Sequence, residues 1–126
     1  MKKIRNYKEL LFFKESIDLV PLLYDITKKF PKEDRGFNGL MSQIRRASVS
    51  VSSNIAEGSS RGEKEYYHFL TLSLGSLREI ETQILISKRL KYISDEEYVE
   101  IYEKIDSCIS RLCKYIKAIS KNNRVV

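Results

Sequence analysis

The chain has 126 residues, the size of a single domain, and we expect one domain over residues 1–126. Hydrophobic residues make up 42% and charged residues 32%, a balance that excludes a disordered chain. The formal net charge of +6 favours polyanionic partners and says nothing about the fold. No apolar stretch is long enough to predict a membrane span or a secretion signal, so we expect a cytoplasmic protein without a membrane partner.

Glycine and proline are scarce, which favours long helices over many short strands. The first helix is predicted at about 7–29, with Asn6 and Glu9 as a capping box. The second is predicted at about 39–57 and ends at Gly58, a common helix stop.

The third helix is predicted at about 61–91, with Ser60 and Glu63 as a second capping box. Gly75 lies in its middle, where we expect another helix or a partner chain to pass closely. The fourth is predicted at about 95–120, after a capping box of Ser94 and Glu97. Four amphipathic helices with short connections predict an all-α fold, an antiparallel up-and-down four-helix bundle.

One face of the second helix is polar without being lysine-rich or glutamate-rich. Its members, which fall within about 100° on a helical wheel, are Gln43, Arg46, Ser50, Ser53, Asn54 and Glu57. Arginine and asparagine offer well-directed hydrogen-bond donors, and Glu57 is a suitable ionic partner for an arginine. Three interpretations stay open: an ordinary solvated face, a polar network at a subunit contact, or direct contact with phosphates or bases.

Basic residues gather at both ends of the chain, and an antiparallel bundle brings these ends together. The two clusters are Lys2, Lys3, Arg5 and Lys8, then Lys114, Lys117, Lys121 and Arg124. Such a patch is typical of RNA or DNA binding, and Tyr7 and Tyr115 nearby could stack on bases. The alternative is a solubilising end with lysines at the C-terminus of a helix.

The turn at 58–62 could hold an anion at the start of the third helix, with Arg61 as its clamp; the alternative is a plain stop-and-cap turn. Glu65 and His68 have the spacing of a di-iron motif, but His68 is the only histidine, so a second motif cannot exist. Cys108 and Cys113 point in different directions on a helix and cannot share a metal. We therefore expect no metal, no cofactor, no catalytic residues and no enzyme activity.

Several motifs together resemble one known family. They are Phe30-Pro31, Gly39-Leu40, Gln43-Ile44-Arg45-Arg46-Ala47, Asn54-Ile55-Ala56-Glu57-Gly58, Arg61, Phe69-Leu70 and the run from Gly75 to Gln83. The chain resembles the four-helix bundle proteins encoded in intervening sequences of bacterial 23S rRNA genes. The resemblance implies a homopentamer and an association with rRNA or ribosomes, and a distant relative in diversity-generating retroelements binds nucleic acid and a reverse transcriptase. It carries over no catalytic residues, and Arg45, Arg46, Asn54, Glu57 and Arg61 match its motif positions.

Three functional hypotheses follow. The leading one is a non-catalytic homo-oligomer that binds structured RNA through nine basic candidates: Lys2, Lys3, Arg5, Arg45, Arg46, Arg61, Lys114, Lys117 and Lys121. The second is a protein–protein interaction or assembly module that uses Gln43, Arg46, Asn54 and Glu57 and binds no nucleic acid. The third is an enzyme with a metal in the bundle.

Overall fold

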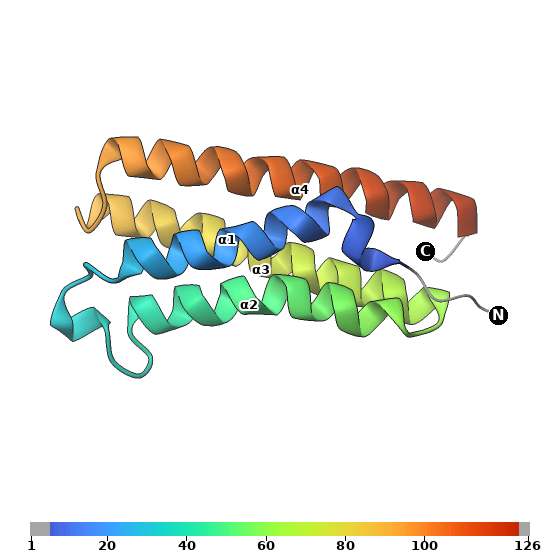
Figure 1. Cartoon of the computed structure of the whole chain (residues 1–126), viewed down its shortest axis with the longest axis horizontal. Helices are drawn as coiled ribbons and strands as arrows, with labels where there is room; N and C mark the ends of the chain where they lie inside the picture. The colour runs from blue at the N-terminus through green and yellow to red at the C-terminus, as the bar shows by residue number, and fades with distance from the viewer. Residues whose placement is uncertain (1–5, 124–126) are drawn as a thin grey trace.

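The computed structural model describes residues 6–123, and four helices follow one another along them. They are α1 (Leu11–Thr27), α2 (Leu40–Ser59), α3 (Glu63–Arg89) and α4 (Asp95–Asn123). Two short 3-10 helices, η1 (Tyr7–Glu9) and η2 (Lys32–Asp34), precede α1 and α2. Consecutive helices run in opposite directions, and α1 packs against both α2 and α4, which closes the ring (Figure 1). The predicted all-α four-helix bundle is confirmed.

One apolar core runs along the centre of the bundle. It is built from residues three and four apart on each helix, the spacing that keeps side chains on one face. Fully buried members include Leu19, Leu23, Ile44, Ile55, Leu70, Leu77, Ile80, Ile84, Ile101, Ile105 and Leu112. Small buried hydroxyl residues bridge the helices, as where Ser73 donates to the Val51 carbonyl at 2.8 Å.

Two of the three predicted capping boxes are wrong. Asn6 makes no side-chain cap, and the extended backbone of Leu10 separates η1 from α1. Ser60 ends α2 instead of starting α3, which follows Gly62. The Ser60 hydroxyl donates to the Glu57 carbonyl at 3.2 Å.

Gly58 lies inside α2 rather than after it, at the point where α3 approaches α2 closely. A Cβ placed at Gly58 would stand 2.6 Å from the Cβ of Phe69, so only glycine fits. No described glycine has a positive φ, so the expected glycine stop is wrong. Gly75 shows the reverse: within the described chain nothing lies within 4 Å of a Cβ built there, so no helix of this chain passes it.

The third capping box is confirmed. The Glu97 N–H donates to the Ser94 hydroxyl at 3.0 Å, and the Ser94 N–H donates to the Glu97 carboxylate at 2.8 Å. Lys29, just past α1, also pairs with the Glu97 carboxylate. Hydrogen bonds from Lys29 and from the Ser94 backbone lower the pKa of Glu97. This end of the bundle is thereby fastened by a cap that also joins α1 to α4.

Candidate nucleic-acid interface

The short helix η1, the α2–α3 turn and the end of α4 lie at the same end of the bundle (Figure 1). The side chains of Lys8, Lys114, Lys117 and Lys121 are all exposed. We call these lysines the basic end. The other predicted members, Lys2, Lys3, Arg5 and Arg124, lie outside the described residues. The antiparallel order thus brings the described parts of the two basic clusters to one end, as expected.

The charges of α4 change sign along its length. Its first three turns carry the acidic residues Asp95, Glu96, Glu97, Glu100, Glu103 and Asp106, with Lys104 as the cation among them. After Asp106 the sequence contains no acidic residue. Lys114, Lys117 and Lys121 are three and four residues apart, so they share one helix face over about 10 Å. One half of α4 is therefore strongly acidic and the other strongly basic.

Arg61, the predicted anion clamp, is engaged by carboxylates of its own chain. Its guanidinium pairs with Glu57, four residues before it, and lies 3.7 Å from Glu65, four residues after it. It also lies over the Phe69 ring, 5.1 Å from the centroid. The hydrogen bond that it donates to the Glu57 carboxylate is the main cause of its raised pKa. The α2–α3 turn therefore carries carboxylates on both sides of its arginine, in contrast to the end of α4.

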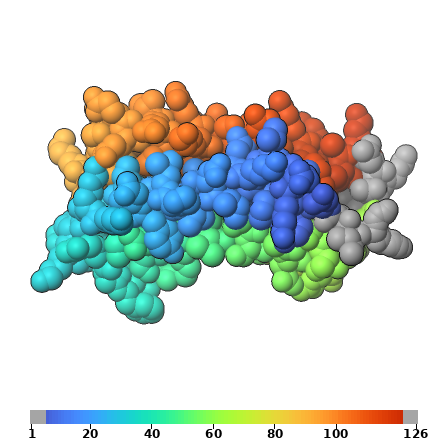
Figure 2. Space-filling view, in the orientation of Figure 1, coloured from blue at the N-terminus to red at the C-terminus, as the bar shows by residue number. Residues whose placement is uncertain are grey.

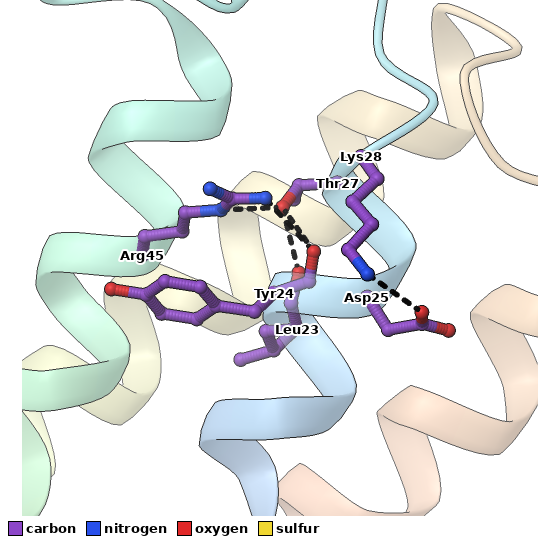
Figure 3. A network of polar contacts seen from close by, with 6 residues as sticks. All are labelled: Leu23, Tyr24, Asp25, Thr27, Lys28 and Arg45. Atoms are coloured by element: carbon purple, nitrogen blue, oxygen red, sulfur yellow. Dashed lines mark hydrogen bonds and ion pairs between the residues drawn. The ribbon is translucent and has the colours of Figure 1, made fainter.

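Arg45 reaches from α2 to the end of α1 (Figure 3). Its Nε donates to the Thr27 hydroxyl and its Nη2 to the Tyr24 carbonyl, each at 2.9 Å. The guanidinium also lies 4.5 Å from the centroid of the Tyr24 ring. The last carbonyls of a helix lack partners within the helix, and a cation there also complements the helix dipole. The structure thus uses Arg45 to join α1 to α2.

The polar face of α2 borders a shallow groove against α3. The groove holds about 160 Å³ and is lined by Gln43, Arg46, Ala47, Ser50, Ser76 and Glu79. Ser50 is its centre: its hydroxyl accepts from the Asn54 amide at 3.0 Å and from the Ser76 hydroxyl at 3.1 Å. Sequence reasoning found the α2 members but missed Ser76 and Glu79, because only the docking of α3 identifies them.

No hydrogen bond or ion pair joins the four predicted members of this polar network to one another. Gln43 donates to the Asn38 carbonyl at 2.8 Å, and Arg46 donates to the Ser42 hydroxyl at 3.1 Å. Asn54 bonds to Ser50, and Glu57 pairs with Arg61. Arg46 remains exposed at the rim of the groove.

The two tyrosines expected to stack on bases both pack against rings of the bundle. Tyr115 is half-buried, 5.0 Å from the Phe12 ring, and its hydroxyl bonds to that of Tyr66 at 2.9 Å. Tyr7 is half-buried and meets Phe13 edge-on at 5.0 Å.

An acidic groove of about 400 Å³ lies between α1 and α4, which adjoin on the face shown in Figure 2. Its lining residues are Glu15, Asp18, Leu19, Glu100, Glu103, Lys104 and Ser107. One Glu15 oxygen accepts from the Ser107 hydroxyl at 2.6 Å and from Arg111 at 3.3 Å. Sequence reasoning missed this groove, although the spacing of Glu100 and Glu103 on one helix was its signal.

Among residues 6–123, no group of three or more His, Cys, Asp or Glu side chains is arranged to hold a metal ion. Cys108 is buried, and burial raises the pKa of its thiol to about 12. Cys113 is only half-buried. No helix of the described chain is both long enough and apolar enough to cross a membrane.

Comparison with known proteins supports this architecture. No curated protein matches the chain. A solved structure that is similar is a protein of unknown function from the S23 ribosomal protein family of Bacteroides thetaiotaomicron. It is 22% identical, with a TM-score of 0.76 over 85% of this chain and 96% of that one, and therefore shares the fold. The family described as 23S rRNA-intervening sequence protein matches residues 8–114, so the chain belongs to that family.

Proposed function

We propose that this protein is a non-catalytic homo-oligomer that binds structured RNA, ribosomal RNA first of all, through its basic end. The main support is the exposed row of Lys114, Lys117 and Lys121 on a helix half without acidic residues. Lysines arranged in this way neutralise phosphates and release counterions, which drives binding. The family description, which names 23S rRNA, fits the same partner.

Fluorescence anisotropy of labelled rRNA fragments, titrated with the protein at about 0.05 to 0.2 M salt, tests this function. We expect affinity that falls steeply as salt rises, because each phosphate contact releases counterions. Replacing Lys114, Lys117 and Lys121 by Ala should weaken binding at about 0.1 M salt. Replacing Lys28, Lys32 and Lys104 by Ala removes the same charge elsewhere and should change the RNA affinity little. An absence of rRNA binding even at the lowest salt would refute the function.

A second function, self-assembly or docking of a protein partner, is supported by the groove between α2 and α3. A bonded cluster of Ser50, Asn54 and Ser76 beside Arg46 and Glu79 presents polar groups in a fixed arrangement. A subunit contact would use these groups, because a polar rim with defined hydrogen bonds is typical of protein interfaces. The pentamer implied by the family resemblance is part of this proposal.

Arg46→Ala separates the two functions. If the groove builds the oligomer, this variant should change the assembly mass, measured by light scattering, and leave the RNA affinity of each subunit intact. Arg78→Ala is the matched control, because Arg78 is exposed on α3 outside the groove and pairs with Glu81 at 3.7 Å. An unchanged mass with lost RNA binding would place Arg46 in the RNA surface instead.

A further inference from the structure

The basic end offers charges to a ligand but few aromatic surfaces. The half-buried rings of Tyr7 and Tyr115 pack against Phe13 and Phe12. In the described chain, three Tyr and Phe side chains are more than about a third exposed: Tyr24, Phe37 and Tyr102. All three belong to segments away from this end. His68 is exposed near it, with its ring edge-on to Phe69 at 5.9 Å. Proteins that bind single strands commonly present exposed rings on which successive bases stack.

The arginines near this end that the structure describes are engaged within the chain. Arg61 pairs with Glu57 and Glu65, and Arg111 pairs with Glu15 at 3.3 Å. Arginine, with its planar fork, is the side chain that most often reads guanine edges, whereas a lysine ammonium acts as a point charge. Among residues 6–123, the exposed cations near this end other than these arginines are Lys64 and the lysines of the basic end. Their chemistry suits phosphates and carries little information about base sequence.

We propose, building on the RNA-binding function above, that the basic end recognises the phosphate backbone of a double helix and no base. A duplex offers two rows of phosphates, and so a higher charge density than a single strand of the same length. It also needs no stacking platform, because recognition of double-stranded RNA rests mainly on shape and backbone contacts. The ligand class is therefore a double-stranded nucleic acid, read by charge alone.

The acidic half of α4 restricts this recognition to one end of the molecule. Glu100 and Glu103 line the acidic groove together with Asp18 of α1. Like charges repel a polyanion that approaches from the side, while the basic end attracts it. The bundle should therefore meet the duplex end-on, with the α1–α4 groove directed away from it.

Anisotropy titrations with four ligands test this proposal. They are an RNA hairpin stem of about 16 base pairs, a stem of scrambled sequence, an unstructured single strand of equal length and a DNA duplex of the same sequence. We expect both stems to bind within about twofold of each other and about tenfold tighter than the single strand. The DNA duplex should bind within about tenfold of the RNA stem, because lysine reads phosphate in both.

Variants refine the same titration. Replacing Lys114, Lys117 and Lys121 by Ala should reduce the slope of log K against log salt by about three for each bound subunit, roughly one per phosphate contact. His68→Ala should leave affinity for the stems unchanged. A single strand that binds as tightly as the stems, a preference between the two stem sequences, or an RNA preference well above tenfold would overturn the proposal. Loss of binding to every ligand at low salt would instead refute the RNA-binding function itself.

Discussion

Arg45 and Arg46 are neighbours in α2 and serve different purposes. Arg46 is exposed beside the α2–α3 groove, while Arg45 is half-buried and hydrogen-bonded to the end of α1. The helical wheel already separated them, because consecutive residues point about 100° apart. It could not identify the partners of Arg45, because these depend on how α1 docks on α2.

Arg45→Ala should destabilise the fold and leave RNA binding almost unchanged. The variant loses two charge-assisted hydrogen bonds and the contact with the Tyr24 ring. Because the site is partly exposed and Thr27 keeps its bond to the Leu23 carbonyl, we expect a loss of about 1–2 kcal/mol in the free energy of unfolding. Urea denaturation measures this loss. A variant of normal stability with weakened RNA binding would show that Arg45 contacts the ligand instead.

Gly58→Ala should lower stability because the new methyl group meets the α3 backbone region. The contact would be 2.6 Å from the Cβ of Phe69, which cannot move away as a flexible side chain would. Overpacking of this kind costs about 1–3 kcal/mol in the free energy of unfolding. Gly36→Ala is the control: a Cβ there meets nothing within 4 Å, and the change should be neutral or stabilise by up to about 1 kcal/mol. Equal stability of the two variants in thermal unfolding would contradict the close approach.

At the scale of elements, periodicity in the sequence was sufficient to predict all four helices and their order. Their ends were predicted less well, since a Ser-x-x-Glu pattern occurs both at Ser94, where it caps a helix, and at Ser60, where it does not. The difference is tertiary: Gly58 lets α2 pass under Phe69 and continue to Ser59, so Ser60 falls at the end of α2. No local pattern reports that packing.

The cap of α4 should make part of the stability depend on pH. Hydrogen bonds from Lys29 and from the Ser94 backbone lower the pKa of Glu97 in the folded protein. The unfolded chain has the ordinary value of about 4.3, so folding favours the ionised form. The stabilisation from Glu97 is fully present at pH values above the unfolded pKa. It is lost as the pH falls through the lowered pKa of Glu97 in the folded protein.

Glu97→Gln isolates the charge in that contribution, because a glutamine oxygen can still accept from the Ser94 N–H. We expect the variant to be less stable than the wild type at pH 7 and to approach it as the pH falls from about 5 to 3. Chemical denaturation at each pH measures the difference. Glu96→Gln, a neighbouring exposed acid without a described partner in the cap, is the control. A difference that is constant with pH would show that the ion pair with Lys29 contributes nothing.

For the molecule as a whole, the sequence predicted where the basic charge gathers but not how charge is divided between the faces. The placement of η1 and the end of α4 at one end of the bundle followed from antiparallel order alone. The acidic groove required the pairing of α1 with α4, since Asp18 and Glu103 are far apart in sequence. Pairing also decided which arginines are engaged within the fold, as with Arg111 and Glu15.

This division of charge predicts that weakening the acidic half will strengthen RNA binding at low salt only. Eleven residues separate Glu103 from Lys114 on α4, which is about 16 Å along the helix. The Debye length is about 30 Å at 0.01 M salt and about 8 Å at 0.15 M, so repulsion from Glu100 and Glu103 reaches a bound duplex only in dilute salt. Replacing both by Gln should raise affinity roughly three- to tenfold at 0.01 M, because several charge pairs each contribute about 0.2 kcal/mol in water. At 0.15 M the affinity should equal that of the wild type.

Lys104→Gln is the matched control for this prediction, because Lys104 is exposed on the same stretch of α4 and lines the same groove. Loss of the Lys104 charge should lower RNA affinity at 0.01 M salt and have almost no effect at 0.15 M. The change in affinity is thus opposite in sign to that of the Glu100 and Glu103 replacements, and salt screens it in the same way. Anisotropy titrations of the RNA stem at the two salt concentrations compare the variants directly. If the variant with glutamine at positions 100 and 103 lost affinity, or if its effect persisted at 0.15 M, the duplex would have to contact the α1–α4 groove itself, and end-on binding would be wrong.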